Sequence, residues 1–395
     1  MGNHETYLYV NVPFCLKRCL YCYCTLIFSD EELLSFKKNA EPFTQALLTE
    51  IDAFDGSDKK CRGVSFGGGT PSLLSVAQLE RILKAVKNCC AGFDDKAQVS
   101  IETFPGTKSR DELEAMRAIG FNRASLGAQS FDDDELRFFN RAHDVKTFYK
   151  TYEDLRAAGF DNVNIDLLFG LPNSSMEKWK KSVDAALELE PEHLTAYYWY
   201  PTSGNSFYIK IMEGELKLPD RETSVEQYQY VIDAAAKRGL KRYWDFNFAR
   251  EGYQYNIERD TFRLFPIRGF GPGSWSQEGT KLVWDPCRLQ LYLKNPLKRW
   301  EQECTVDYYL MRVMMFPQGL VYKEFEDLFG KKWAFGLLGE NVRQTLDIWI
   351  EKGLVEKDNA GFRFRKETAA EASVYLAELH TRSLYCPGEK LPVSS

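Results

Sequence analysis

The stretch Val12-Pro13-Phe14-Cys15-Leu16-Lys17-Arg18-Cys19-Leu20-Tyr21-Cys22-Tyr23-Cys24 decides the fold of this chain. It holds four cysteines within ten residues, directly after a short strand-like run at residues 7–12. Three of them, Cys15, Cys19 and Cys22, have the spacing C-x3-C-x2-C, so one loop can present three thiolates to one metal centre. Thiolate sulfur is the ligand that zinc, copper(I) and iron–sulfur clusters prefer.

The spacing alone leaves zinc and an iron–sulfur cluster equally open. A structural zinc site would need a fourth ligand, which Cys24 could supply, but such sites usually combine two separated C-x2-C pairs, and no second pair follows. A disulfide framework fits poorly, because the other six cysteines are scattered and adjacent Cys89 and Cys90 fall in a helical pattern.

Composition places the chain among ordinary globular proteins. Of its 395 residues, 44% are hydrophobic and 27% charged, which disfavours disorder. A net charge of −6 without a long basic run argues against nucleic acid and anionic membranes as partners. No apolar run has the length of a membrane span, and residues 1–5 lack the apolar core of a signal peptide. We therefore expect a cytoplasmic protein.

Strand-like and helix-like segments alternate from the cysteine loop to about Leu240. Amphipathic stretches such as 76–86 have apolar positions at helical spacing, and Ser109 with Glu112 has the pattern of a capping box. Six β-then-α units predict a parallel sheet with helices outside, too short to close as an eight-fold barrel. The fold class is therefore α/β, an open partial (β/α)6 barrel; its strands are expected at residues 7–14, 63–66, 99–104, 123–126, 163–169 and 194–200.

Unusual residues follow three of these strands, at the carboxyl edge where parallel α/β folds bind ligands. Gly67-Gly68-Gly69-Thr70-Pro71 leaves the backbone bare for close approach, although a flexible turn is the plain alternative. Glu102 and Gln129 stand at two further strand ends. Buried polar groups need partners, so both are candidate ligand contacts, while each alone could be a solvated strand end.

Residues from about Thr305 onward carry no signal for chemistry. Helices are expected at 307–315, 322–329 and 340–352, and a two-stranded wing at 354–356 and 361–364. This pattern predicts a small winged-helix-like α+β domain. We divide the chain into a barrel at 1–262, a glycine loop and linker at 263–304, and this C-terminal cap at 305–395.

Several motifs, in order, resemble one known family. The cysteine loop resembles that of radical S-adenosylmethionine (SAM) enzymes, and further motifs resemble the oxygen-independent coproporphyrinogen III oxidase-like (HemN/HemW-like) group, which includes heme chaperones and class C methyltransferases. These further motifs are Tyr9-x-Asn11-x-Pro13-Phe14-Cys15, Gly67–Pro71, Asn122-Arg123-x-Ser125-x-Gly127-x-Gln129-Ser130-Phe131, Asn140-Arg141-Ala142-His143 and Asp166-Leu167-Leu168-x-Gly170-Leu171-Pro172.

The resemblance implies two kinds of cofactor. Cys15, Cys19 and Cys22 would bind three irons of a [4Fe–4S] cluster, and a SAM molecule would chelate the fourth; Cys24 would not be a ligand. The positions that correspond to contacts with this first SAM are Tyr9, Tyr21, Gly68 and Glu102. A second SAM would be bound by Gly69, Thr70, Gln129, Arg141, Asp166 and Tyr200, with Arg141 suited to a methionine carboxylate and a surface ion pair as the plain alternative for Arg141 and Asp166.

The chain also departs from the family. Asn11 stands where the oxidases have a histidine, and the His-Asn pair of the heme chaperones is replaced within Tyr255–Phe262. Aromatic residues dominate the segment that would face the substrate, and such a group could clamp a flat molecule, although most aromatics are core residues. They are Tyr197, Tyr198, Trp199, Tyr200, Tyr243, Trp244, Phe246 and Trp275. The loop Gly269–Ser274 resembles the family's glycine loop.

Both SAM sites are retained while the heme-handling features are lost, so we expect a class C methyltransferase. One SAM would give a 5′-deoxyadenosyl radical that takes hydrogen from the methyl group of the second, whose carbon then adds to an sp2 carbon of the substrate, by C-methylation or cyclopropanation. The alternatives are heme ring-opening, coproporphyrinogen III decarboxylation, or a non-enzymatic heme chaperone. Expected partners are a small-molecule or peptide-derived substrate, including aromatic ones, and a reduced flavodoxin- or ferredoxin-type donor.

Overall fold

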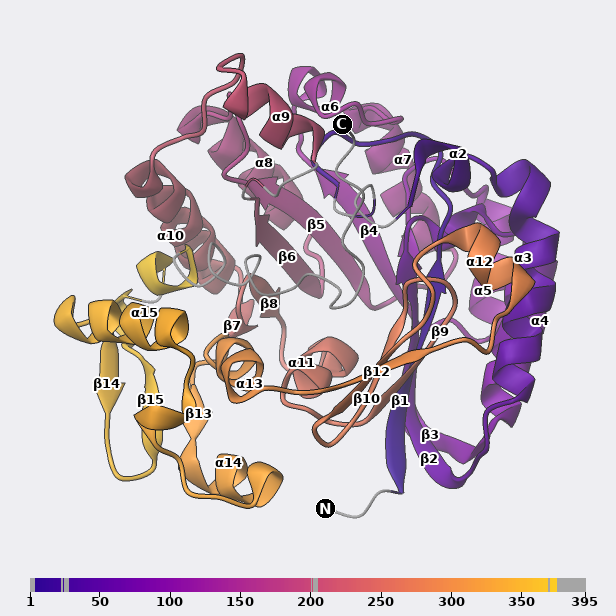
Figure 1. Cartoon of the computed structure of the whole chain (residues 1–395). Helices are drawn as coiled ribbons and strands as arrows, with labels where there is room; N and C mark the ends of the chain where they lie inside the picture. Colours follow the sequence, from indigo (N-terminus) through magenta and orange to yellow (C-terminus); the bar gives the residue numbers. More distant parts are fainter. Residues whose placement is uncertain are drawn as a thin grey trace. The chain divides into compact units, whose positions relative to one another are not determined.

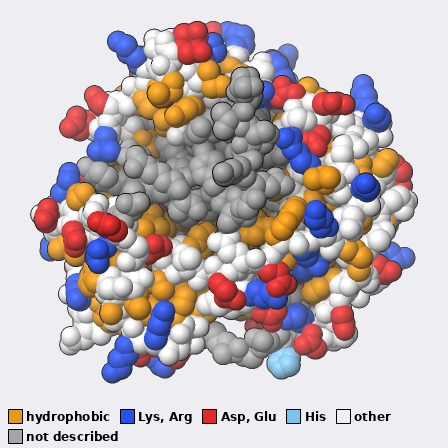
Figure 2. All heavy atoms as spheres, in the orientation of Figure 1, with side chains coloured by type: hydrophobic (Ala, Val, Ile, Leu, Met, Phe, Trp, Pro, Cys, Tyr) orange, Lys and Arg blue, Asp and Glu red, His pale blue; other side chains and the backbone are white. Residues whose placement is uncertain are grey.

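A computed structural model describes residues 4–22, 24, 28–199, 201, 205–368 and 370–374. The chain divides into two compact units, Met1–Cys304 and Thr305–Ser395, each with its own sheet. Among the described residues, no helix combines the length and apolar character needed to cross a membrane. On the face drawn in Figure 2, Lys and Arg side chains are interspersed with Asp and Glu.

The first unit is built on a 12-stranded sheet in the order β12-β11-β10-β9-β1-β2-β3-β4-β5-β6-β8-β7. Its six central strands are parallel neighbours in chain order, as expected for an open barrel. They are β1 (Glu5–Val12), β2 (Gly56–Gly68), β3 (Cys90–Thr103), β4 (Arg123–Gln129), β5 (Val163–Phe169) and β6 (His193–Tyr198). The mixed α/β partial barrel predicted from the sequence is confirmed.

Helices cover the outer side of these strands, with strands and helices alternating along the chain (Figure 1). The capping box of Ser109 and Glu112 is present, with the Glu112 amide donating to Ser109 Oγ at 3.3 Å. The helices between β1 and β7 are α2 (Asp30–Leu33), α3 (Phe36–Asp52), α4 (Val76–Asn88), α5 (Arg110–Ile119), α6 (Asp133–Phe138), α7 (Val145–Ala157), α8 (Met176–Glu188), α9 (Ser206–Met212) and α10 (Arg221–Lys237), with a short 3-10 turn at Pro71–Leu73.

Strands not expected from the sequence extend both edges of the sheet. β9 (Ile267–Phe270) pairs parallel with β1, and β10 (Trp275–Glu278), β11 (Lys281–Trp284) and β12 (Trp300–Glu303) continue antiparallel beyond it. At the other edge, β8 (Asn247–Ala249) and β7 (Lys241–Trp244) follow β6. Two helices join these strands, α11 (Asn256–Phe262) and α12 (Leu289–Lys294).

Two local expectations were wrong. Cys90 is not helical: α4 ends at Asn88, Cys89 caps it, and Cys90 begins β3. β2 and β3 both start well before the apolar runs from which they were predicted. Their first residues pair with each other at a partly exposed end of the sheet, from Gly56 opposite Cys90. A polar start leaves no alternation from which a strand can be predicted.

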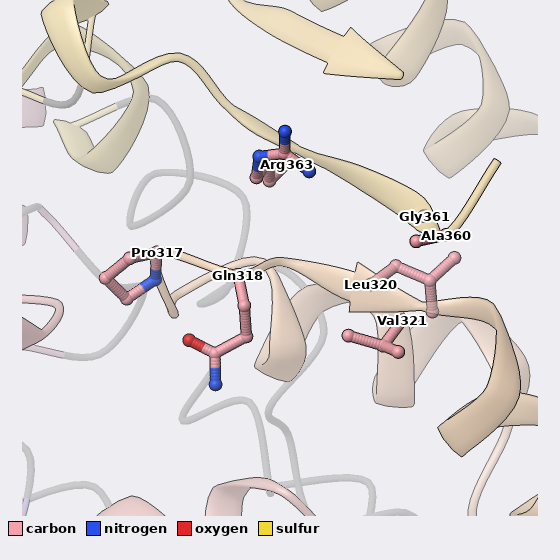
Figure 3. A pocket seen from close by; sticks show the side chains of 7 residues that line it. All are labelled: Pro317, Gln318, Leu320, Val321, Ala360, Gly361 and Arg363. Atoms are coloured by element: carbon pink, nitrogen blue, oxygen red, sulfur yellow. The ribbon is translucent and has the colours of Figure 1, made fainter. Parts of the chain in front are cut away.

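The second unit contains the expected three helices and wing. The helices are α13 (Val306–Val313), α14 (Tyr322–Phe329) and α15 (Glu340–Glu351), and an antiparallel sheet joins β13 (Leu320–Val321), β15 (Gly361–Phe364) and β14 (Val355–Lys357), with 3-10 turns at Phe335–Leu337 and Lys366–Thr368. Its core is aromatic, with the rings of Phe325 and Phe329 stacked at 4.7 Å. A pocket on this unit is lined by Pro317, Gln318, Leu320, Val321, Ala360, Gly361 and Arg363 (Figure 3). Because Arg363 pairs there with Glu356 and Asp358, the pocket offers no free catalytic group.

Candidate functional site

The cysteine loop leaves the carboxyl end of β1 and is fastened to the barrel by its backbone. The Cys15 amide donates to Leu33 O at 2.8 Å, and the Cys22 amide turns back to Cys19 O at 3.2 Å. Side chains from other elements hold its carbonyls: Asn140 Nδ2 donates to Arg18 O at 2.7 Å, and Trp199 Nε1 donates to Tyr21 O at 2.9 Å. These bonds fix where the three thiols lie.

The thiols of Cys15, Cys19 and Cys22 share one environment. All three are free; Cys19 is buried and the other two are half-buried. Burial raises the pKa of Cys15 to about 12, and the charges of Cys22 and Cys19 raise it further, while a hydrogen bond with Thr70 opposes them. Burial also raises the pKa of Cys19, against the opposing charge of Arg141. Thiolates crowded in this way need a positive partner, which a cluster would provide.

The donor set fits a [4Fe–4S] cluster held by three cysteines. Among the residues that the structure describes, no three His, Cys, Asp or Glu side chains surround a position for a single metal ion. A cluster makes a different demand, because each cysteine binds its own iron. Cys24 is otherwise engaged, since its Sγ donates to Gly68 O at 3.2 Å.

The glycine run after β2 lies against the cysteine loop with no room for side chains. A Cβ on Gly69 would lie 2.4 Å from Phe14 O, and one on Gly68, whose φ is +99°, would lie 2.2 Å from Asn11 Oδ1. The Gly69 amide donates to Val12 O at 2.8 Å. The run is therefore needed for close approach of two backbones, and it brings Thr70 to the thiol of Cys15.

Arg141 links the cysteine loop to the end of β4. Its Nη1 donates to Tyr21 Oη at 3.0 Å and lies 3.6 Å from Cys19 Sγ, while Nη2 donates to Gly127 O at 2.7 Å. The guanidinium stacks 4.1 Å above the Phe104 ring, and its Nε is buried without a partner. A surface ion pair, the plain alternative, is not what this residue forms.

A second group of side chains points inward from the strands. Asp166 accepts from Asn164 Nδ2 at 2.7 Å and Ser125 Oγ at 3.0 Å, and Gln129, in the left-handed region at φ +69°, reaches Asp166 O with Nε2 at 3.5 Å. Burial raises the pKa of Asp166. The pKa of Glu102 rises to about 8, first because burial disfavours its carboxylate and then through the charges of Asp166, Glu258 and Cys22.

Tyr9 and Glu102 meet at Gly67, where a Cβ would lie 2.7 Å from the tyrosine Oη and 2.5 Å from the glutamate Oε1. Burial, followed by the charge of Glu102, raises the pKa of Tyr9. We call Tyr9, Glu102, Asp166 and Tyr197 the inner polar cluster. Gly68, the next residue after Gly67, accepts from Cys24 Sγ at 3.2 Å, so this cluster lies close to the cysteine loop.

Most candidate residues thus come together in two adjoining groups. Cys15, Cys19, Cys22, Tyr21, Thr70 and Arg141 form one, and Tyr9, Glu102, Gln129 and Asp166 the other, with Gly68 and Gly69 between the loop and β1. Tyr200 lies outside the described residues.

Four of the eight aromatic residues named for a clamp have other roles in the structure. Trp199, Trp244 and Phe246 are buried in the core, at 1%, 2% and 6% exposure. Tyr243 has a structural role, because its Oη bonds His193 Nε2 at 2.8 Å and accepts from the Tyr255 amide at 3.1 Å. Of the members that the structure describes, Tyr197 is the exposed one, and it belongs to the inner polar cluster.

The sequence does not identify Arg123 and Glu258 as neighbours of the inner polar cluster, although both their charges act on the pKa of Glu102. Arg123 stands in a motif that assigns it no role, and Glu258 lies on a helix, α11, that the sequence does not predict. Alternation along β4 could have found the first, since Arg123, Ser125 and Gly127 share the side that faces Asp166. The sequence pattern around Glu258 does not indicate that its carboxyl lies near the inner polar cluster.

The glycine loop Gly269–Ser274 is held beside β1. Asn11 Nδ2 donates to Pro272 O at 2.5 Å, and the Gly271 amide donates to Glu50 Oε2 at 2.8 Å. Glu50, with no exposed surface, also accepts from Arg268 Nη2 at 2.7 Å, Tyr292 Oη at 2.7 Å and Arg299 Nη2 at 2.9 Å. A buried ionic network centred on Glu50 therefore fixes this wall of the site.

Comparison with known proteins agrees with this geometry. The radical SAM superfamily matches residues 9–186. The heme chaperone HemW of Bacillus subtilis (strain 168) is 30% identical over 266 residues, 67% of this chain and 69% of that protein. The oxygen-independent coproporphyrinogen III oxidase of Escherichia coli (strain K12) is 32% identical over 225 residues, 56% of this chain and 48% of that protein.

The fold comparison extends over nearly the whole chain. The solved structure of coproporphyrinogen III oxidase (HemN) from Escherichia coli, a radical SAM enzyme, superposes with a TM-score of 0.75 over 94% of this chain and 89% of that chain, at 24% identity. The structural similarity shows the fold of the chain, and the sequence matches show its family. The chain belongs to the radical SAM superfamily, with HemW- and HemN-type proteins as its relatives.

Proposed function

We propose that this protein cleaves SAM reductively at a [4Fe–4S] cluster and acts on a tetrapyrrole. The observation that carries the proposal is the position of the cysteine loop beside the inner polar cluster: Cys24 Sγ donates to Gly68 O at 3.2 Å, and the adjacent Gly67 lies against Tyr9 and Glu102. The substrate class is taken from relatives that are named for heme and for coproporphyrinogen III. This places tetrapyrrole chemistry ahead of the methyl transfer expected from the sequence.

Cys15, Cys19 and Cys22 would hold the cluster, which, when bound, supplies the electron for SAM cleavage and hence the 5′-deoxyadenosyl radical. Arg141 has an unpartnered Nε beside the thiols and can bind a carboxylate of SAM there. When SAM is bound, Glu102 and Asp166 would form hydrogen bonds with its hydroxyl or ammonium groups. A reduced flavodoxin- or ferredoxin-type protein would supply the electron.

The inner polar cluster is suited to an anionic substrate because its carboxyls resist ionisation. With a pKa of about 8, Glu102 remains largely protonated at neutral pH, and Asp166 is shifted in the same direction. Protonation lowers the negative charge that a carboxylate-bearing macrocycle would meet, and a protonated carboxyl can also donate a hydrogen bond.

The test is anaerobic reconstitution with iron and sulfide, followed by incubation with SAM, dithionite and either coproporphyrinogen III or heme. We expect 5′-deoxyadenosine in amounts that rise when a tetrapyrrole is present, together with a change in tetrapyrrole mass. Tight heme binding without any SAM cleavage would instead identify a chaperone. SAM cleavage that ignores both tetrapyrroles would reject the proposed substrate class.

Methyl transfer remains the second candidate, on one observation. Gln129, Arg141 and Asp166, the positions that resemblance assigns to a second SAM, converge around the end of β4, where Arg141 Nη2 bonds Gly127 O and Gln129 Nε2 reaches Asp166 O. SAM labelled in its methyl carbon distinguishes the two functions. Label in the product together with S-adenosylhomocysteine would favour methyl transfer.

A further inference from the structure

Helix α11 lies against the inner side of β2 and β3 and is fixed there by specific bonds. The Asn256 amide donates to Gln98 Oε1 at 3.0 Å, and Tyr255 Oη bonds Ser65 Oγ at 2.5 Å. Ile257, 3% exposed, packs with Tyr7 and Ile267 in one hydrophobic cluster. The helix therefore has a defined orientation, and its next residue, Glu258, has a defined direction.

Glu258 lies near the inner polar cluster, because Tyr255 at the start of its helix bonds Ser65 on β2 and has the Arg123 guanidinium 4.1 Å above its ring. The pKa values of Glu102 and Tyr197 are both raised in part by the charge of Glu258, and Asp166 in turn raises that of Glu258. Burial is the largest cause of the shift at Glu258, which brings its pKa to about 7. Yet its carboxyl makes no hydrogen bond and no ion pair with any residue in the described part of the chain.

Arg123 provides an independent observation at the same place. Its side chain is 2% exposed, and its guanidinium donates a single hydrogen bond, from Nη1 to Ser100 Oγ at 3.0 Å, while Nε has no partner. It stacks 4.1 Å above the ring of Tyr255 and makes no ion pair with a described residue, although its charge is the main one that lowers the pKa of Glu258.

A buried guanidinium with an unbonded Nε is unfavourable, because Arg123 has lost water without gaining a strong partner, whereas Glu258 is half-buried and its carboxyl remains available to a ligand. A direct Arg123–Glu258 pair would relieve that loss but would also occupy the carboxylate oxygens. Tyr197, near the carboxyl end of β6, keeps 38% of its surface accessible, and the charge of Glu258 contributes to its raised pKa. The neighbourhood of Glu258 is therefore open to a ligand on the side of Tyr197.

We propose that Glu258 is a substrate-binding residue that accepts hydrogen bonds from N–H groups of the substrate, with Arg123 holding the carboxylate in place from a distance. On the proposed function, on which this inference rests, the N–H donors are pyrrole nitrogens. Arg123 acts as a positioning residue and Glu258 as the residue that distinguishes a ligand with N–H groups from one without them.

The test compares coproporphyrinogen III, whose four pyrrole N–H groups can turn out of the macrocycle, with coproporphyrin III, which has the same carboxylates but keeps its N–H protons in the ring plane. Binding to the cluster-reconstituted holoprotein is measured by anaerobic equilibrium dialysis. We expect the native protein to prefer coproporphyrinogen III, and Glu258→Leu to reduce that preference by about tenfold, the effect of one or two hydrogen bonds. Glu258→Gln keeps an acceptor oxygen and should retain part of the preference.

Glu251→Gln, a change at a side chain that is 89% exposed, is the matched control and should leave the preference unchanged. An unaltered preference in Glu258→Leu, with both ligands still bound, overturns the role of Glu258 and leaves the proposed function standing. If the native protein binds neither ligand, the proposed function and this inference both fail. Glu258→Gln preserves the size and shape of the side chain. If Glu258→Leu loses binding of both ligands while Glu258→Gln binds both normally, the loss is an effect of packing, and the inference is contradicted.

Discussion

At the residue scale, Arg141 is the side chain on which the two groups of the site depend. It bonds Tyr21 Oη and Gly127 O and stacks on Phe104. Arg141→Lys keeps the charge but loses the planar fork, so we expect SAM affinity to fall about 10- to 100-fold and stability to fall by about 1–3 kcal/mol. Equilibrium dialysis and urea unfolding measure these effects. Arg110→Lys, at an exposed pair with Glu114, should change neither.

The three loop cysteines make a prediction of their own. Cys19→Ser removes one thiolate from the shared environment, and we expect reconstituted iron to fall from about four atoms per chain to a small fraction of that content. Iron analysis and absorbance report the loss. Cys89→Ser, outside the loop at the end of α4, should retain a full cluster; equal iron in both variants would mean that Cys19 is not a ligand.

Glu102 predicts a pH dependence of stability in the apoprotein. Its pKa is about 8 when folded and 4.5 ordinarily, so the folded state holds a proton that the unfolded chain has released. Stability must then fall as pH rises from the ordinary value to about 8, by about 2 kcal/mol between pH 6.5 and 8. Urea unfolding of the reduced apoprotein measures the slope, and Glu102→Gln should flatten it. An unchanged slope would exclude Glu102 as its cause.

The sequence predicted most of the strand-end residues because ordered motifs carry them. Glu102, Gln129 and Asp166 all follow apolar runs, and strand alternation then fixes the side on which they lie. Glu258 and Arg123 could not be found in this way. These two side chains stand out because they do not form an ion pair with each other. That depends on the relative positions of α11 and β4 and not on a local sequence pattern.

At the scale of elements, the expected α/β units and the winged-helix-like unit correspond to helices and strands of the structure, whereas the edge strands do not. β9 and β10 are four residues each, and their pairing partners lie far away in the chain, so no local alternation announces them. The polar starts of β2 and β3 escaped prediction for a similar reason.

The junction of α3 with the glycine loop gives a prediction at this scale. Glu50→Gln removes the buried charge shared by Arg268 and Arg299, so we expect a loss of about 3–5 kcal/mol in the free energy of unfolding. Urea unfolding measures it, and faster hydrogen exchange at the Gly271 amide should accompany it, since that amide donates to Glu50. Glu41→Gln, whose partner Arg81 is exposed, should cost less than about 1 kcal/mol.

At the scale of the whole molecule, the charge of the chain bears on its partners. Winged-helix-like units can bind nucleic acid, but the net charge here is −6, and acidic and basic side chains alternate on the face drawn in Figure 2. We expect binding to duplex DNA to be weaker than about 100 µM at physiological salt. Fluorescence anisotropy with a labelled duplex tests this, and saturation at low micromolar protein would contradict it.

Helix α11 and its cluster of Tyr7, Ile257 and Ile267 fill the amino end of the barrel, and this has a kinetic consequence. We expect a molecule that reaches Glu258 to enter from the carboxyl edge, past the cysteine loop, and to leave by the same route. The two ligands should therefore bind in a fixed order, in which the substrate, which binds deeper, enters before SAM and leaves after it. SAM added ahead of the substrate should slow the first turnover, and pre-steady-state mixing in both orders would reveal a lag in only one of them.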